Sequence, residues 1–188
     1  YPAMEKHIDY LINQGVHGLF IVGTSGEFHV LSEDEKYNYA KAVVAHVAGR
    51  IPVYVGVGAC GTKETITLAK RMATLNPQAL TVITPYLVKI SQKELEEHFR
   101  QIAHAVDLPI ILYNIPANTG INISAEVVKN LADCKNILGI KDSSGDMENL
   151  KSYLDNTDSS FSVLVGSDSK VLAALKLGAV GAVASTSN

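Results

Sequence analysis

Lys141 is the residue of this chain best suited to covalent chemistry. It continues the apolar run Gly139-Ile140 and is followed by Asp142. An ammonium group at the end of a buried strand is costly to keep charged, so desolvation lowers the pKa of the amine. A neutral amine can attack a ketone and form a Schiff base. The alternative is a lysine that pairs with Asp142 or extends its stem toward water.

Hydroxyl side chains follow two other apolar runs. Tyr113 lies near the end of the run that begins at Pro109, where a phenol can move a proton. A tyrosine whose hydroxyl is bound to backbone is the commoner use of this residue. Thr24 and Ser25 stand between glycines, and their hydroxyls and backbone N–H groups suit a carboxylate or an oxyanion. The alternative, which the spacing alone favours, is an ordinary turn with capping hydroxyls.

Further polar groups follow apolar runs in the second half of the chain. They are Ser143, Gly166, Asp168 and Ser185. The groups after the last two runs, Gly166-Ser167-Asp168 and Ser185, suit a hydroxylated substrate. Turns and helix N-caps explain Asp168 and Ser185 about equally well.

Two other kinds of site are poorly supported. The six histidines show no paired metal-ligand spacing and no H-E-x-x-H motif, so no metal is expected. Residues 56–61 match G-x-G-x-x-G between a predicted strand and a predicted helix, which is the local context of dinucleotide binding. The acid that should follow the next strand is missing, because that strand ends Ile83-Thr84-Pro85. Dinucleotide binding therefore stays a minor alternative.

The elements that must position these residues alternate along the chain. Seven apolar runs rich in β-branched residues indicate strands buried on both faces, as in a parallel sheet. They span residues 18–22, 52–57, 79–84, 109–115, 137–140, 161–165 and 179–184. Amphipathic patterns between them predict helices at residues 3–14, 33–47, 62–74, 93–106, 125–131, 147–154 and 169–177. Capping boxes begin at Ser32 and Ser91.

This alternation predicts an α/β fold. The strand starts recur about every 30 residues, as expected of a TIM (β/α)8 barrel of ~250 residues. Only seven strands are visible and the first element is a helix, so we expect a truncated barrel whose first strand and C-terminal helices are missing, with a natural protein longer at both ends. No linker divides residues 1–188, which we interpret as a single, partial barrel domain. An open, doubly wound sheet is the alternative.

The composition is that of a folded domain. The chain has 188 residues, of which 47% are hydrophobic and 19% charged, with a net charge of −3. No run approaches the ~20 apolar residues of a membrane span. The mildly acidic balance argues against nucleic acid as the main partner. The two cysteines, Cys60 and Cys134, are far apart, which favours a reduced, cytoplasmic compartment.

Taken in order, the motifs after the strands resemble those of the pyruvate-dependent class I aldolase family. That family includes dihydrodipicolinate synthase, N-acetylneuraminate lyase and 2-keto-3-deoxy sugar acid aldolases. Residues 23–27 are similar to its carboxylate-binding loop, and residues 113–120 to its tyrosine motif. Residues 139–146 resemble its Schiff-base lysine segment, and residues 166–168 with 177–181 resemble its last two strands. The resemblance runs over essentially the whole chain.

The resemblance implies a lyase that needs no cofactor. Lys141 would form a Schiff base with pyruvate or another 2-keto acid, and Tyr113 would move the proton. Thr24 and Ser25 would hold the carboxylate, and Thr24 would also belong to the catalytic group. Family likeness further implies a homo-oligomer, either a dimer or a tetramer. The other implied substrate-binding residues are Gly166, Asp168, Ser143 and Ser185.

Two departures bear on the aldehyde partner. Asn118 stands where the resemblance to dihydrodipicolinate synthase calls for an arginine that binds a substrate carboxylate, and asparagine offers no charged fork. Leu87 stands where that enzyme has a second tyrosine. We therefore expect an aldolase for a 2-keto-3-deoxy sugar acid or a 4-hydroxy-2-oxo acid. The alternatives are a dihydrodipicolinate synthase (4-hydroxy-tetrahydrodipicolinate synthase) and a non-catalytic keto-acid-binding paralogue.

Overall fold

The structure is a computed structural model that describes residues 1–188, and its framework is one parallel sheet. The strands are β1 (Leu19–Ile21), β2 (Val53–Val57), β3 (Ala79–Ile83), β4 (Ile110–Asn114), β5 (Ile137–Asp142), β6 (Ser162–Val165) and β7 (Gly181–Ala182). All neighbours pair in parallel, and the order in the sheet is the order in the chain. The seven predicted strands are confirmed. A doubly wound sheet needs a reversal of strand order, so that alternative is wrong.

Helices alternate with the strands. The α-helices are α1 (Pro2–Asn13), α2 (Glu33–Val47), α3 (Thr62–Ala73), α4 (Gln92–Ala105), α5 (Pro116–Thr119), α6 (Ala125–Ala132), α7 (Met147–Asn156) and α8 (Val171–Leu177), and the 3₁₀ helices are η1 (Phe28–Val30) and η2 (Asp168–Lys170). Both predicted capping boxes are present, at Ser32 and Ser91. The last helix begins at Val171 and not at residue 169, because η2 precedes it. None of the helices combines the length and the apolar character that crossing a bilayer requires.

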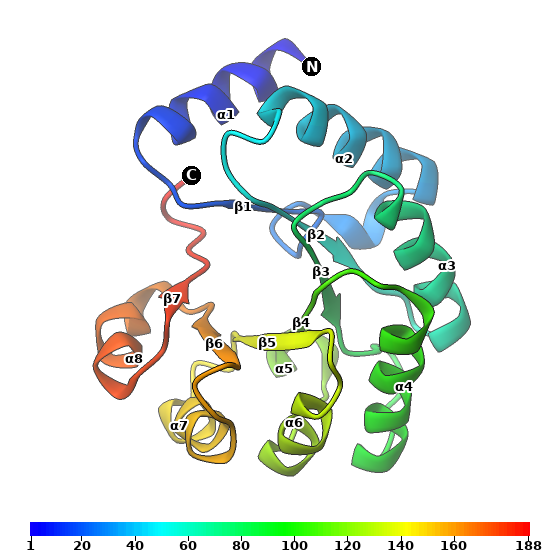
Figure 1. The fold of residues 1–188 in the computed structure, drawn as a ribbon, viewed down its shortest axis with the longest axis vertical. Coiled ribbons are helices and arrows are strands. Elements are labelled where there is room, and N and C mark those ends of the chain that lie inside the picture. Colours follow the sequence, from blue (N-terminus) through cyan, green and yellow to red (C-terminus); the bar gives the residue numbers. More distant parts are fainter.

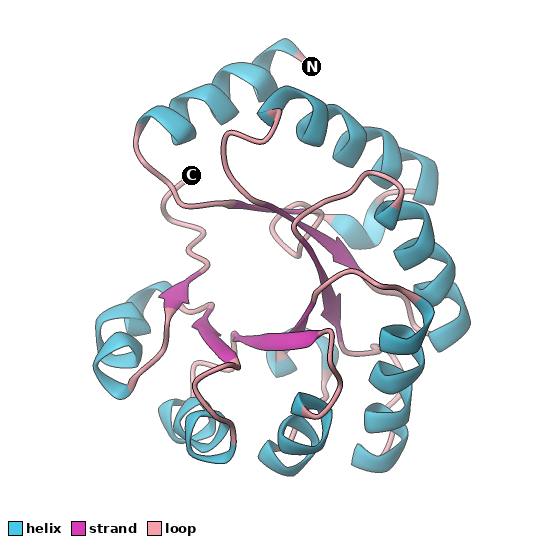
Figure 2. Ribbon diagram, viewed as in Figure 1, coloured by secondary structure: helices cyan, strands magenta, loops and turns pink.

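The sheet curls, and the helices lie on its outer, convex side (Figures 1 and 2). β1 pairs only with β2, and β7 pairs only with β6, so the sheet does not close on itself. The segment after β7 turns back toward β1 (Figure 1), where Ser185 Oγ lies 3.2 Å from Ser25 Oγ. The structure thus shows an α/β fold whose seven parallel strands follow one another in the sheet in chain order. A closed barrel of eight strands stays a prediction.

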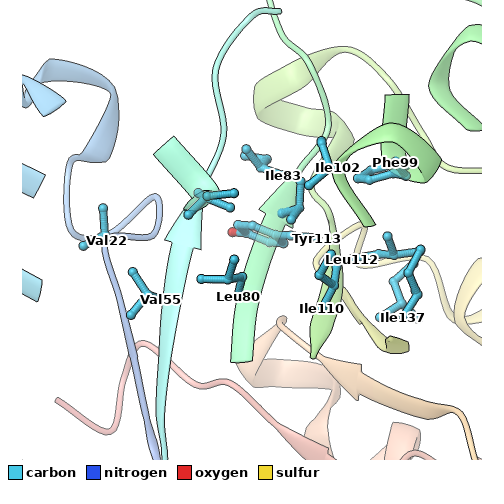
Figure 3. Close-up of a cluster of buried hydrophobic side chains, with 14 of the residues drawn as sticks. Val22, Val55, Leu80, Ile83, Phe99, Ile102, Ile110, Leu112, Tyr113 and Ile137 are labelled. Atoms are coloured by element: carbon cyan, nitrogen blue, oxygen red, sulfur yellow. The ribbon is translucent and has the colours of Figure 1, made fainter. Parts of the chain in front are cut away.

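Much of the hydrophobic core lies between the sheet and the helices outside it. Figure 3 shows Ile110 and Leu112 of β4 beside Phe99 and Ile102 of α4, and all four side chains are buried. Burial of each such side chain contributes about 1.5–3 kcal/mol. Successive strand residues point to opposite faces, so Tyr113 projects to the inner side of the sheet. The outer face therefore holds the fold together and leaves the inner face free for polar groups.

The amino ends of β4 and β5 are tied to the helix layer by one side chain. Asn136 immediately precedes β5, and its carbonyl accepts a hydrogen bond from Ile110 N at 2.7 Å. Its Nδ2 donates to the carbonyl oxygens of Ala103, Val106 and Leu108 at 3.0, 2.9 and 3.3 Å. Asn136 thus anchors the end of the strand pair that lies away from the polar groups after the strands.

Candidate active site

Lys141 and Tyr113 are cross-strand partners on β5 and β4. The Lys141 Nζ lies 4.0 Å from the centre of the Tyr113 ring and 4.6 Å from the centre of the Phe20 ring. The side chain is 8% exposed, and none of the ion pairs of the chain involves it. Burial lowers the pKa of Lys141 to about 8, although the negative charge of Asp168 acts in the opposite direction. The predicted desolvated amine is therefore present.

The Tyr113 hydroxyl is directed toward the loop after β1. It lies 3.2 Å from Thr24 Oγ1, so either oxygen can donate to the other. Burial raises the pKa of Tyr113, while hydrogen bonds with Thr24 and Ser143 act in the opposite direction. Figure 3 shows the ring beside Leu80 of β3, with Val22, which follows β1, farther along the sheet. The structure thus brings a phenol, two further hydroxyls and a lysine amine together.

The backbone that leads into the Thr24–Ser25 loop is strained. Val22 is buried and β-branched, and its φ of 57° lies in the left-handed region. Such a conformation costs of order 1–3 kcal/mol and persists only where neighbours enforce it. One of those neighbours is Gly56 of β2, because a Cβ at that position would overlap the Val22 carbonyl. Close approach of β1 and β2 therefore fixes the path of the loop.

Gly166 has no side chain, and the Lys141 side chain occupies the space that a Cβ at position 166 would fill. A Cβ on Gly166 would lie 2.8 Å from Lys141 Cε and would collide with Ser143 Oγ. Contacts this short do not occur between real atoms, so any larger residue would displace the lysine. The Gly166 N–H also donates to the Asp142 carbonyl at 2.7 Å, which holds β6 beside β5. Gly166 thus lies against the amine-bearing side chain through backbone alone.

Asp168 has a different place from the one that the sequence predicts. Its carboxylate accepts hydrogen bonds from the backbone N–H groups of Ser185 and Thr186 at 3.1 and 3.3 Å. It anchors the segment after β7 and contributes charge, but it does not line the cavity. The remaining predicted residues do line one cavity of about 1110 Å³; they are Thr24, Ser25, Tyr113, Lys141, Ser143, Gly166 and Ser185.

The two positions that bear on the aldehyde partner differ in their surroundings. Asn118 lines the same cavity, and Lys141 is the only lysine or arginine among the lining residues. Leu87 does not line the cavity; its side chain is 87% exposed and its φ is 77°. A second anionic group near Asn118 would therefore meet an amide and no second lysine or arginine of this chain. No group of three or more His, Cys, Asp or Glu side chains could hold a metal ion.

Sequence reasoning missed the partners of Lys141 and Asp142. The proposed ion pair between these two residues is wrong, because Asp142 is 2% exposed and accepts hydrogen bonds from Asn114 Nδ2 at 2.9 Å and Ser144 N at 3.1 Å. The alternation of strand side chains was the signal that could have shown it, since neighbours on a strand face opposite ways. Phe20, which lies under the amine, carried no signal beyond its place in an apolar run.

The whole chain resembles proteins of one family. Residues 2–188 match the Dihydrodipicolinate synthetase family. The chain is 39% identical over 188 residues to the 4-hydroxy-tetrahydrodipicolinate synthase of Oceanobacillus iheyensis, covering 100% of this chain and 64% of that relative. It therefore spans just under two thirds of the length of such relatives.

Solved structures agree. A prophage protein of the dihydrodipicolinic acid synthase family from E. coli K12, in complex with pyruvate, superposes with a TM-score of 0.96 at 38% identity, covering 100% of this chain and 64% of that one. Dihydrodipicolinate synthase from Aquifex aeolicus gives a TM-score of 0.95 at 35% identity, with 97% and 63% covered. The resemblance of the strand-end motifs is therefore confirmed, and the chain belongs to the dihydrodipicolinate synthetase family.

Proposed function

We propose that the full-length protein is a Schiff-base-forming lyase, which makes or breaks a carbon–carbon bond between pyruvate and an aldehyde. The observation that carries this proposal is the buried Lys141 amine against the Tyr113 ring, in a cavity that also holds Thr24 and Ser25. With a pKa of about 8, roughly a tenth of the amine is neutral at pH 7, whereas an ordinary lysine is almost entirely charged. The family relation supports the same chemistry.

Each step needs only groups of the cavity and water. The Lys141 Nζ attacks the keto carbon of pyruvate, and loss of water leaves an iminium ion. The neighbouring carbon then loses a proton to water, and the iminium accepts the electron pair that is released, which gives an enamine. The enamine carbon then bonds to the aldehyde carbon, and the aldehyde oxygen takes a proton from Tyr113. Water hydrolyses the iminium and frees the lysine; bond cleavage is the reverse sequence.

Thr24 and Ser25 fit the role of carboxylate ligands. Their loop brings two hydroxyls to the mouth of the cavity, and Ser185 faces Ser25 from the segment after β7. Thr24 is also within hydrogen-bond distance of the Tyr113 hydroxyl, so a bound carboxylate would lie next to the proton donor. We assign Ser143, Gly166 and Ser185 to the substrate-binding wall. Asp168 supports that wall through the backbone of residues 185–186.

The identity of the aldehyde divides two candidates. The names of the relatives favour 4-hydroxy-tetrahydrodipicolinate synthase over the sugar-acid aldolase that the sequence alone suggested. One observation keeps the sugar-acid candidate: Asn118 lines the cavity, and this chain places no lysine or arginine other than Lys141 there to bind a second carboxylate. We therefore propose 4-hydroxy-tetrahydrodipicolinate synthase as the first candidate activity. The second is a sugar-acid aldolase, which would act on a hydroxylated, uncharged aldehyde.

The fold and surroundings of the whole protein are proposals of the same kind. We propose that residues outside this chain complete a TIM (β/α)8 barrel, within which residues 1–188 are one partial domain. Assembly as a dimer or tetramer and a cytoplasmic location stay predictions. A related solved structure is that of a monomeric dihydrodipicolinate synthase variant, and size measurement of the full-length protein in solution tests the assembly.

Reduction with borohydride in the presence of pyruvate tests the proposal. Intact full-length protein should gain one pyruvate-derived mass, and Lys141→Ala should abolish this gain. Lys36 provides the matched control, because it is also buried, lies 5.6 Å from the Phe28 ring centre and has a pKa lowered by burial. The Lys36→Ala variant should keep the adduct. Absence of any adduct on the wild-type protein would reject the proposed function.

A substrate comparison then separates the two aldehydes. Full-length protein is assayed for condensation of pyruvate with an aldehyde that bears a carboxylate, and for pyruvate release from 2-keto-3-deoxy acids. The Asn118→Arg variant supplies the missing cation and should improve kcat/KM for the carboxylate-bearing aldehyde by about 10-fold or more. Wild-type preference for the carboxylate-bearing aldehyde would exclude the sugar-acid candidate, and the reverse preference would exclude the synthase.

A further inference from the structure

We propose that Asn114 and Asp142 are positioning residues that hold Lys141 and Tyr113 in register, and we call this pair, together with Ser144, the outer clasp. The inference rests on the proposed function, because it explains how the reacting pair is held. The clasp lies on the opposite face of the same two strands and touches no part of the cavity. It would therefore act through the backbone and not on the substrate.

Strand geometry links the two pairs. Tyr113 pairs with Lys141 across β4 and β5, and the next residues, Asn114 and Asp142, pair with each other. Because strand residues alternate in direction, one pair faces the cavity and the other faces the helices. A slip of one residue between the strands would turn Lys141 out of the cavity. Whatever fixes the pairing of Asn114 with Asp142 thus also fixes the pairing of Tyr113 with Lys141.

The ladder between these strands needs such a device. Its register shifts between Ile110 and Ile111, because Ile110 pairs with Ile137 whereas Ile111 pairs with Gly139. The amino ends of the strands, anchored by Asn136, therefore do not dictate the register farther along. Bulges of this kind re-aim side chains, and the pairing beyond them must be held by other contacts.

The outer clasp supplies those contacts. Asn114 Nδ2 donates to Asp142 Oδ1 at 2.9 Å, and Ser144 donates through its N–H to Oδ1 at 3.1 Å and through its hydroxyl to Oδ2 at 2.8 Å. The Asn114 carbonyl also accepts from Ser143 N at 2.8 Å. A buried carboxylate held only by neutral donors in this way is costly to rearrange.

The clasp is tied to the layer outside the sheet. Asn114 Oδ1 accepts from Ile123 N at 3.0 Å, and the Tyr153 hydroxyl of α7 donates to the Ile123 carbonyl at 2.6 Å. Asn149, one turn earlier on α7, donates to the Tyr153 hydroxyl at 2.9 Å. The Lys141 amine lies over two aromatic rings and makes no hydrogen bond or ion pair, so polar contacts of its own do not fix its position. The position of the amine follows that of the β5 backbone.

The test compares four variants of the full-length protein. Asn114→Ala and Asp142→Ala remove clasp hydrogen bonds. Asp142→Asn is nearly isosteric and can keep them, which separates geometry from charge. Asn136→Ala is the matched control, since it removes hydrogen bonds from the other end of the same strands. The rate of borohydride trapping with saturating pyruvate is measured for each variant, at a temperature well below every Tm.

The clasp predicts a specific order of rates. Asn114→Ala and Asp142→Ala should slow trapping by about 10- to 100-fold, because the amine no longer meets the keto carbon in register. Asp142→Asn and Asn136→Ala should stay within about threefold of the wild type, because both keep the clasp hydrogen bonds. Wild-type rates in Asn114→Ala would overturn the proposal. A trapping rate in Asn136→Ala as low as in Asn114→Ala would overturn it too. So would a trapping rate in Asp142→Asn as low as in Asp142→Ala.

A second readout does not depend on pyruvate. Reductive methylation of Lys141 with formaldehyde and cyanoborohydride, followed by peptide mass spectrometry across pH, reports the environment of the amine. In Asn114→Ala and Asp142→Ala the profile should move to higher pH as the amine becomes hydrated, while Asn136→Ala should match the wild type. If the wild type traps no pyruvate, the proposed function fails. The pH profile of methylation then decides by itself whether the clasp positions Lys141. An unchanged profile in both clasp variants rejects the clasp.

Discussion

The two faces of the β4–β5 pair differ in the hydrogen-bond partners that they offer to buried polar residues. On the outer face, Asp142 and Asn114 have partners for their polar atoms among side chains and backbone. On the inner face, Lys141 is nearly as buried but has aromatic rings around its amine and no ion pair. The same two strands thus carry an outer pair whose polar atoms have hydrogen-bond partners and an inner pair in which Tyr113 has partners but the Lys141 amine has none.

This difference shows how a rigid wall can carry a reactive group. An unsatisfied amine is destabilised in its charged form, which lowers its pKa and makes it a nucleophile at neutral pH. The same lack of partners would leave the position of the lysine side chain undefined. Hydrogen bonds on the opposite face of the strand supply the missing restraint. Successive residues of a strand point to opposite faces. One residue can therefore carry the amine while its neighbour holds the strand in place.

The largest expected effect separates two buried tyrosines. Tyr113→Phe should lower kcat for bond formation or cleavage by about 10²- to 10³-fold, because the proton donor is lost, while pyruvate trapping by Lys141 persists. Tyr153→Phe removes the hydrogen bond to the Ile123 carbonyl and should lower the free energy of unfolding by about 1–3 kcal/mol. Steady-state kinetics and urea unfolding measure the two effects. Loss of trapping in Tyr113→Phe would contradict the division of roles.

The next prediction concerns the sign of a stability change. Lys141→Met should raise the free energy of unfolding at pH 7 by about 3 kcal/mol, because it removes the cost of burying the ammonium. The unfolded lysine keeps its proton up to a pKa near 10.5, whereas the folded one loses it near 8. Wild-type stability therefore rises with pH across this window, and the advantage of Lys141→Met shrinks there.

The outer face should respond with the opposite sign. Asp142→Leu leaves the Asn114 amide and the Ser144 donors without an acceptor and should destabilise the protein by about 2–4 kcal/mol. Denaturant unfolding of both variants at pH 7 and at pH 10 gives all the values needed. Destabilisation by Lys141→Met would show that the amine has partners in the folded state that offset its burial.

The smallest effect is a shift of a pH profile. The negative charge of Asp168 raises the pKa of Lys141, so Asp168→Asn should move the inflection of pyruvate trapping to a pH below about 8. Asparagine still offers one acceptor to the backbone of residues 185–186. Asp158→Asn is the control, because that carboxylate bonds only to Ser160 near the surface. An inflection that moves upward, or equally in the control, would rule out this coupling.

The sequence predicted the strands well because their apolar runs are long and β-branched. It predicted β7 over residues 179–184, whereas only Gly181–Ala182 form strand, since β7 has a neighbour on one side alone. The short helices η1 and α5 were missed, because one turn is too short to show a helical period. Strand order could not be read from the runs, because both a barrel and a doubly wound sheet repeat the same units.

The site was predictable where chemistry is local and not where it depends on direction. Lys141 and Tyr113 could be found because each ends an apolar run, and parallel strands bring such ends together. The backbone contacts of Asp168 could not be predicted, since a carboxylate after a strand can face the cavity or the backbone with the same spacing. The hydrogen bond of Asn114 was missed, because it depends on a partner on another strand.

The contact between Gly56 and Val22 makes the protein sensitive to substitution at a residue that carries no side chain. Replacement of glycine by alanine adds one methyl group, but at position 56 that methyl would strike the Val22 carbonyl and release the strained turn ahead of Thr24 and Ser25. Among randomly mutated copies of the gene, position 56 should therefore tolerate no substitution. A survey of inactivating variants would thus mark this glycine, to which we assign no contact with substrate, as strongly as Lys141, which we propose forms the Schiff base.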